Sequence, residues 1–166
     1  MIQKIAILLI ALSLQSCLFP FDGNSDDVEP PSSYYKAVYM NRDAFETSVS
    51  LQNSNSIDKA GKIYVYQNYL FINEKNKGFH VYDNTNPSNP KAIKYIKVPG
   101  ATDIAIKNDA IYINQARDLI AIKLGADLQS LTVTKRVKNI FPEMLSPDGF
   151  SARTPEGKVL INWVPK

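Results

Sequence analysis

Residues 62–74 read KIYVYQNYLFINE and residues 103–115 read DIAIKNDAIYINQ, and one constant shift places Ile63 on Ile104 and Ile72 on Ile113. Continued without a gap, the same shift places GFHVYD, residues 78–83, over LIAIKL, residues 119–124. A shift that persists over several segments indicates an internal repeat. The two units cover about residues 61–100 and 101–140.

Apolar residues alternate with polar or aromatic ones within each unit, as they do in a strand with one buried face. The repeat predicts which positions face the core, because apolar residues are kept there: Ile63, Val65, Leu70, Ile72, Phe79 and Val81 in the first unit, and Ile104, Ile106, Ile111, Ile113, Ile120 and Ile122 in the second. The intervening positions change freely: Tyr64, Tyr66, His80 and Tyr82 become Ala105, Lys107, Ala121 and Lys123. These positions are predicted to lie on the opposite face.

Each unit contains the signals for four short strands separated by turns. Gln67-Asn68 and Asn108-Asp109 are suited to tight turns, and Pro87 and Pro90 rigidify the corner before the fourth strand. Four strands in about forty residues is the spacing of a β-propeller blade. We therefore predict a mainly β fold, with antiparallel four-stranded blades of a partial β-propeller.

Further elements flank the repeats. A short N-terminal helix is expected from Arg42 to about Ser50, with Asn41 as its cap and Ala44, Phe45 and Val49 toward the sheet. After a loop, a last strand at residues 159–164 is expected to close or cover an edge. The predicted β domain thus spans residues 34–166, with its C-terminal loop and strand at 141–166.

The first sixteen residues have the features of a signal peptide. Their apolar run, IAILLIALSL at residues 5–14, is too short to span a bilayer as a helix. It ends in LQSC, residues 14–17, which resembles the bacterial lipobox. That resemblance implies that Cys17 becomes the first mature residue and carries acyl chains, which together anchor a protein stably in a membrane. Cys17 is the only cysteine in the chain, so an intramolecular disulfide is excluded.

Residues 17–33 are predicted to form an acidic, disordered tether behind the lipidated cysteine. The segment contains four carboxylates and a Pro-Pro pair, at Asp22, Asp26, Asp27, Glu29 and Pro30-Pro31. Its acidic residues do not follow the calcium-loop pattern, because Gly23 is misplaced and Ser33 stands where a glutamate is required. No metal site and no cofactor are predicted.

The sequence offers little catalytic chemistry, and we expect no catalytic residues. His80 is the only histidine, so a nucleophilic triad would have to be built around it. Carboxylate pairs such as Asp103 with Asp109, or Asp83 with Glu74, leave glycoside cleavage open as an alternative. Candidate ligand-facing residues are Tyr64, Tyr66, His80 and Tyr82. The net charge of +3 comes with scattered basic residues, and nucleic acid is not an expected partner.

GFHVYD followed by NTNPSNP, residues 78–90, resembles the LVIVD repeat, in which a hydrophobic strand ends in Asp before a Pro-containing turn. The N-terminal arm YYKAVYMNRDAFETSVSL, residues 34–51, is similar to the lead-in of bacterial lipoproteins built from that repeat. The second unit departs from the pattern, with Leu124 for the Asp and neither proline.

The resemblance implies a propeller-like envelope lipoprotein, complete or a shortened member of the family, that carries no established catalytic residues. We expect a non-enzymatic interaction module, anchored to the outer membrane and facing the periplasm or the cell surface, with a protein or glycan partner. The alternative is an envelope hydrolase or glycan-processing accessory whose site lies at the loop ends. Two repeats do not close a propeller, so self-association is also expected.

Overall fold

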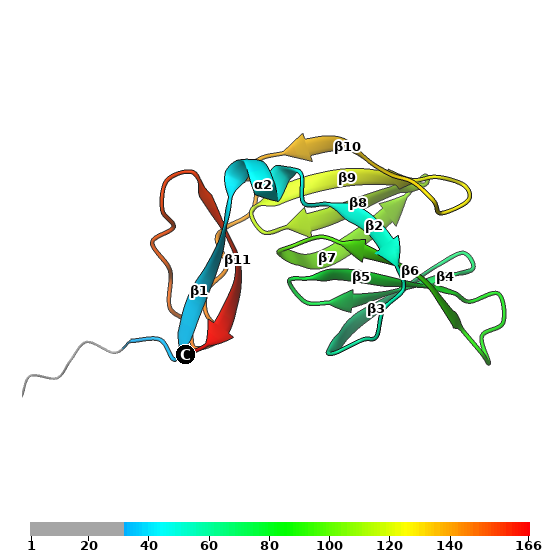
Figure 1. The fold of residues 1–166 in the computed structure, drawn as a ribbon, viewed down its shortest axis with the longest axis horizontal. Helices are drawn as coiled ribbons and strands as arrows, with labels where there is room; N and C mark the ends of the chain where they lie inside the picture. Colours follow the sequence, from blue (N-terminus) through cyan, green and yellow to red (C-terminus); the bar gives the residue numbers. More distant parts are fainter. Residues whose placement is uncertain (1–31) are drawn as a thin grey trace, which may run out of the picture. The chain divides into compact units, whose positions relative to one another are not determined.

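The computed structural model describes residues 32–166, which are built mainly of antiparallel β-strands (Figure 1). The predictions for the signal peptide, for Cys17 and for the tether up to residue 31 lie outside the described residues. The elements are β1 (Tyr35–Asn41), α2 (Arg42–Glu46), β2 (Ser50–Asn53), β3 (Ala60–Tyr66), β4 (Tyr69–Glu74), β5 (Gly78–Asp83), β6 (Lys91–Lys97), β7 (Ala101–Lys107), β8 (Ala110–Gln115), β9 (Asp118–Leu124), β10 (Leu131–Val137) and β11 (Lys158–Pro165).

Two larger sheets contain the two sequence repeats. The first sheet has the order β2-β6-β5-β4-β3, and the second has the order β10-β9-β8-β7. The first two strands of each repeat pair in equivalent registers, because Ile63 lies opposite Ile72 and Ile104 lies opposite Ile113. The repeat is therefore structural as well as sequential.

The third strands, however, are offset by one residue from the ungapped alignment. Ile72 lies opposite His80, whereas Ile113 lies opposite Ile120. The cause is the preceding turn, which separates the Glu74–Gly78 pair in one sheet but the closer Gln115–Asp118 pair in the other. The structural counterpart of His80 is thus the buried Ile120, and the predicted match to Ala121 is wrong.

The main core lies between the two sheets. We call the faces that meet there the inner faces, and the opposite ones the outer faces. The first sheet contributes Phe71, Phe79, Val81 and Ile96, while the second contributes isoleucines at 104, 111, 113, 120 and 122. Packing this many aliphatic and aromatic side chains between two sheets is the main stabilising term of the fold.

The predicted faces of β3 are reversed. Ile63 and Val65 are 60% and 66% exposed, whereas Tyr64 and Tyr66 pack against the core. In β7, by contrast, Ile104 is buried and Ile106 packs against the core, as predicted. The reason is that unlike faces of the two repeats meet: the tyrosine face of the first sheet covers the isoleucine face of the second.

Main-chain hydrogen bonds join the sheets at one end. The Asn76 N–H donates to the Ala101 carbonyl at 2.7 Å, and the Gly100 N–H donates to the Asn76 carbonyl at 2.8 Å. The Ala116 N–H in turn donates to the Gly100 carbonyl at 2.8 Å. Gly100 has a φ of +80° and a Cβ there would lie 3.0 Å from that of Ala116, so glycine suits this crossing point. The turns of both sheets are therefore held against the link between β6 and β7.

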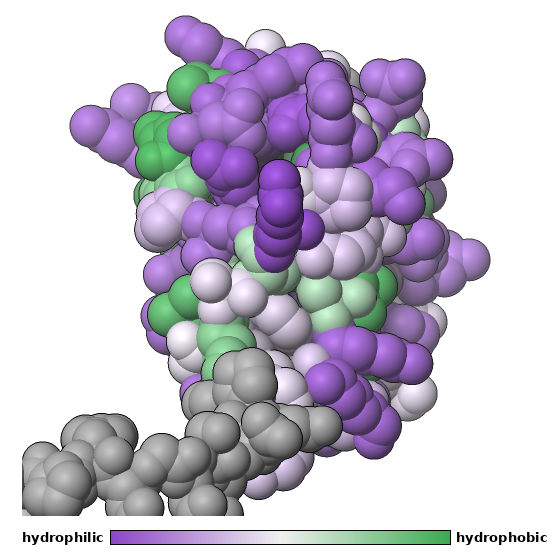
Figure 2. Space-filling model, turned by 90° about the vertical axis from the view of Figure 1, so that its left-hand side faces the viewer, coloured by the Kyte–Doolittle hydropathy of each residue, from purple (hydrophilic) through white to green (hydrophobic). Residues whose placement is uncertain are grey.

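A two-stranded ribbon of β1 and β11 lies at this same end (Figure 1). Asn76 donates to the Asn162 side chain of β11 at 2.7 Å, and a second small core forms from Phe45, Ala116 and Val159. Figure 2 shows that this side of the molecule is largely hydrophilic, with separate hydrophobic areas. The last strand, predicted at residues 159–164, pairs with the N-terminal arm and not with an edge of either larger sheet.

The helix α2 is shorter than the predicted segment, since it ends at Glu46. Phe45 is buried as expected, but Ala44 is exposed, and within the described structure the Asn41 side chain makes no cap hydrogen bond. The Thr47 and Ser48 hydroxyls donate to carbonyls of the helix at 3.1 Å and 2.8 Å. Such local side-chain bonds compete with helix continuation and end it after about one turn.

The first sheet contains a crossing that the sequence did not suggest. β2 and β3 lie at opposite edges of this sheet, so residues 54–59 must pass across β6, β5 and β4. Lys77 contacts both Asp58 of this crossing, at 3.3 Å, and Glu74, at 2.5 Å. The crossing therefore runs past the Glu74 end of the sheet.

Candidate functional site

The four predicted ligand-facing residues do not form one site. Tyr64 and Tyr66 point from β3 to the inner face of the first sheet, whereas His80 and Tyr82 lie on its outer face. Only Tyr66 lines the cleft described below. Within each strand, sequence alternation correctly separates the residues of one face from those of the other. It does not indicate which face of a strand lines a cleft.

A cleft of about 370 Å³ opens between the sheets at the end away from β1 and β11. Its floor is apolar and its rim comes from the β3–β4, β7–β8 and β9–β10 turns. The lining residues are Tyr66, Gln67, Tyr69, Phe71, Val81, Ile106, Asp109, Ile111, Leu124, Gly125, Ala126 and Leu128. The volume is within the range of small-molecule sites, which are typically apolar with few polar groups.

Turn geometry places the polar rim of this cleft. Asn108 and Asp109 have φ values of 48° and 60°, as in the two-residue turn that matches the twist of a hairpin. Asn and Asp tolerate this left-handed conformation better than most residues do. Gln67, on the facing turn, also has a left-handed φ of 51°. The Asp109 carboxylate thus projects beside Tyr66, whose hydroxyl donates to Asp109 Oδ1 at 3.1 Å.

Polar contacts continue along the junction of β3 and β7. The Tyr64 hydroxyl donates to Asp103 Oδ1, and Lys62 Nζ lies 3.4 Å from Asp103 Oδ2. Burial and the hydrogen bond to Asp103 raise the pKa of Tyr64 to about 12. The bond from Tyr64 in turn lowers the pKa of Asp103, with a smaller contribution from Lys62. The tyrosines of β3 therefore bond to the second sheet while their rings pack against the core.

The chemistry of the cleft is that of a binding site. Two tyrosine rings and aliphatic side chains offer an apolar surface, and the Asp109 carboxylate accepts hydrogen bonds. Among the described lining residues, Asp109 is the only one with a carboxylate. The paired carboxylates that glycoside cleavage generally requires are not brought together in this lining.

His80 belongs to a different cluster, on the outer face at the opposite end of the sheet. It is 2% exposed, its Nε2 lies 2.8 Å from Glu74 Oε2, and its ring centroid is 4.7 Å from that of Tyr95. Burial alone would raise the pKa of Glu74, but hydrogen bonds from Lys77 and His80 outweigh it and the pKa is lowered. Asp83, considered above as a partner for Glu74, instead accepts bonds from Thr85.

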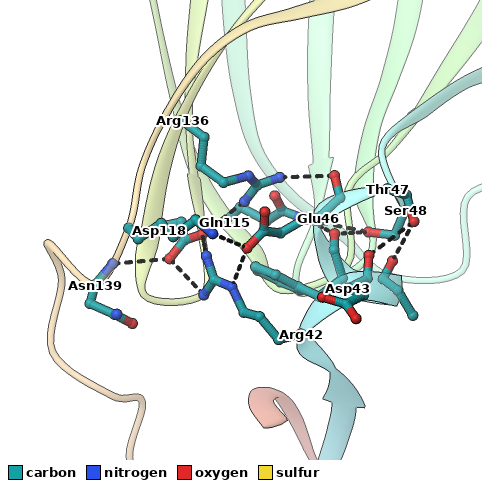
Figure 3. A network of polar contacts seen from close by, with 12 residues as sticks. Arg42, Asp43, Glu46, Thr47, Ser48, Gln115, Asp118, Arg136 and Asn139 are labelled. Atoms are coloured by element: carbon teal, nitrogen blue, oxygen red, sulfur yellow. Dashed lines mark hydrogen bonds and ion pairs between the residues drawn. The ribbon is translucent and has the colours of Figure 1, made fainter. Parts of the chain in front are cut away.

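A third polar cluster, missed by the sequence analysis, joins α2 to the second sheet (Figure 3). Asp118 is fully buried, and its carboxylate accepts hydrogen bonds from both η nitrogens of Arg42. It also accepts from Arg136 Nη1 at 2.9 Å and from the Asn139 N–H at 3.0 Å. Burial would raise the pKa of Asp118, but these bonds outweigh it and the pKa is lowered. Both guanidinium groups also lie over the Phe45 ring, at 5.5 Å and 5.3 Å from its centroid.

Glu46 extends this network toward solvent. It accepts from Arg42 Nε at 2.6 Å and lies 2.6 Å from Lys138 Nζ. The bonds from Lys138 and Arg42 lower the pKa of Glu46. Every charged group named in the network has a partner, so its role is to hold the helix and the arm on the second sheet.

Comparison of the chain with protein-family models, with curated proteins and with solved structures finds no match. Within residues 32–166, no three His, Cys, Asp or Glu side chains lie close enough together to hold a metal ion. None of the helices in this part of the chain has the length and apolar character needed to cross a membrane.

Proposed function

We propose that this protein is a lipid-anchored component of the bacterial cell envelope whose β domain is a non-enzymatic, glycan-binding module. The cleft between the sheets carries the binding proposal, because it combines an apolar floor with two tyrosines and one carboxylate. Aromatic rings pack on the apolar faces of sugars, and a carboxylate accepts bonds from their hydroxyl groups. A single lining carboxylate supports binding more than hydrolysis.

The two larger sheets are, in this proposal, two blades of a shortened LVIVD-type propeller. The equivalent registers of their first two strands and the packing of unlike faces support this interpretation, since successive propeller blades also stack through unlike faces. The lipobox-like LQSC supports anchoring through Cys17, and the short apolar run before it supports a signal peptide. The outer membrane, facing the periplasm or the cell surface, is the proposed location.

The cleft proposal predicts that chitotriose or cellotriose binds the purified protein and shifts the amide signals of the rim turns in NMR spectra. Tyr66→Ala should weaken binding by about two- to tenfold, because loss of one aromatic contact costs about 0.5–1.5 kcal/mol. Tyr112→Ala is the matched control, since Tyr112 is exposed on the outer face of the second sheet. Glycan binding at the cleft is ruled out if neither sugar shifts the rim signals, or if both variants bind equally well.

Lipidation is tested separately in cells. Metabolic labelling with a palmitate analogue should mark the wild-type protein, and Cys17→Ser should abolish the label and leave the uncleaved precursor. The reason is that the acyl chains attach to the cysteine that becomes the first mature residue. Undiminished labelling of Cys17→Ser would show that the lipoprotein proposal is wrong.

A further inference from the structure

Away from the buried His80 cluster, the outer face of the first sheet is apolar and exposed to solvent. Strand registers place Ile63 beside Ile72, and Val65 in line with Leu70, Tyr82 and Ala92. Ile63 and Val65 are 60% and 66% exposed, and the other four are half-buried or exposed. We call these six residues the outer patch. A contiguous apolar surface of this kind usually marks an interaction site.

The same face of the second repeat is covered. Ile104 and Ile106 occupy the positions of Ile63 and Val65 and pair with the corresponding residues of the next strand, Ile113 and Ile111. There the tyrosine face of the first sheet packs on them, and Ile104 and Ile113 are 6% and 0% exposed. Both repeats thus carry a face suited to a covering sheet, yet within residues 32–166 only the second repeat is covered by one.

The outer face of the second sheet, on the opposite side of the sheet pair, has a different charge. The outer face of the second sheet presents Lys107, Lys123 and Lys135 together with Tyr112, all exposed. A head-to-tail stack of copies would press these ammonium groups onto the outer patch, which offers no carboxylate to pair with them. Burying unpaired charges is costly, so this arrangement is disfavoured.

We infer that the outer patch is an interface with a second copy of this chain, which presents the same patch across a two-fold axis. All six residues are uncharged, so the patch meets itself without repulsion between like charges. A two-fold interface pairs identical surfaces and closes, whereas head-to-tail contacts continue into open assemblies. In each copy, this interface covers the outer patch of the first repeat. The equivalent face of the second repeat is already covered by the first sheet of the same copy.

Thiol crosslinking of the full-length chain in cells tests this inference. Treated with a short bismaleimide, the Val65→Cys and Leu70→Cys variants should each give more crosslinked dimer than the parent chain, whose only cysteine is Cys17. Tyr112→Cys should give no excess. When differently tagged Val65→Cys and Tyr112→Cys chains are co-expressed, the product should join the two Val65→Cys chains. Adding Ile63→Asp to Val65→Cys should reduce the dimer by roughly tenfold or more, because the interface would bury an unpaired carboxylate.

Each other outcome overturns the inference. A Val65→Cys product joined to Tyr112→Cys would show a head-to-tail stack, and a product with a different protein would show another occupant. Crosslinking through Val65→Cys but not Leu70→Cys would show edge pairing of β3, because Leu70 lies one strand further into the sheet. Absence of any dimer above the parent level would show that the patch stays uncovered. The cleft is on the other face of this sheet, so the glycan test succeeds or fails independently.

Discussion

Asp118→Asn should destabilise the protein by about 3–5 kcal/mol, the range found when one partner of a buried ion pair is removed. Asp118 is fully buried and accepts from Arg42, Arg136 and the Asn139 N–H. An amide at this position would leave two guanidinium groups facing a neutral side chain that also brings N–H groups. The loss is a large part of the total stability of a typical domain, about 5–15 kcal/mol, and urea unfolding followed by circular dichroism measures it.

The same pair of proteins should differ in their response to pH. The folded pKa of Asp118 lies below its ordinary value of 3.8. The stabilisation by its carboxylate is therefore fully present above that value and is lost as the pH falls through the folded pKa. The stability gap between wild type and Asp118→Asn should be constant near neutral pH and should narrow below pH 3.8.

Asp58→Asn is the control for this prediction. Asp58 also contacts a cation, Lys77 at 3.3 Å, but its side chain is 70% exposed. Exposed ion pairs contribute about 0–1 kcal/mol, so this variant should unfold close to the wild-type midpoint. If Asp58→Asn and Asp118→Asn lost equal stability, the Asp118 network would not be the attachment of α2 that the structure describes.

Ile113→Asp should unfold the domain. Ile113 is 0% exposed in the core between the sheets, and a carboxyl group there has no hydrogen-bonding partner provided for it. Burying such a group costs several kcal/mol, in addition to the lost packing of the isoleucine. The variant should lack a cooperative thermal transition when its near-ultraviolet circular dichroism is followed.

Tyr112→Asp provides the comparison for Ile113→Asp. Tyr112 is the adjacent residue on β8, points to the other face and is 37% exposed. It should retain a cooperative transition within a few degrees of the wild type. Equal loss of structure in the two variants would contradict the strand register of the second sheet.

The sequence predicted the mainly β character of the fold and the strands of both repeats, because hydrophobic alternation and turn residues are local signals. It did not predict which face of β3 is buried. Alternation shows that Ile63 and Tyr64 point to opposite sides, but burial depends on which neighbouring sheet each side meets. His80 was wrongly matched to Ala121 because a turn of different length shifts the third strand by one residue, and an ungapped alignment conceals such a shift.

The candidate site was only partly predictable for a similar reason. Tyr66 was identified, whereas Asp109 was considered only as a turn residue or as half of a carboxylate pair. Its position beside Tyr66 arises from the packing of the two sheets. The Asp118 network combines Arg42, Asp118 and Arg136, which are far apart in the chain and follow no periodic pattern. Only the folded arrangement of α2 on the second sheet brings them together.

The β1–β11 ribbon has a mechanical consequence under the proposed anchoring through Cys17. Tyr35 lies opposite Pro165 and Asn41 opposite Lys158, and the Lys166 N–H donates to the Tyr34 carbonyl at 3.0 Å. Tension applied at residue 32 and resisted by the two larger sheets therefore runs along β1. It loads the hydrogen bonds to β11 together, in shear, instead of opening them one at a time. Beyond Asn41 the load passes to Arg42 and its bonds to Asp118, so a force applied at residue 32 acts on the ribbon and this ion pair before it acts on the cleft.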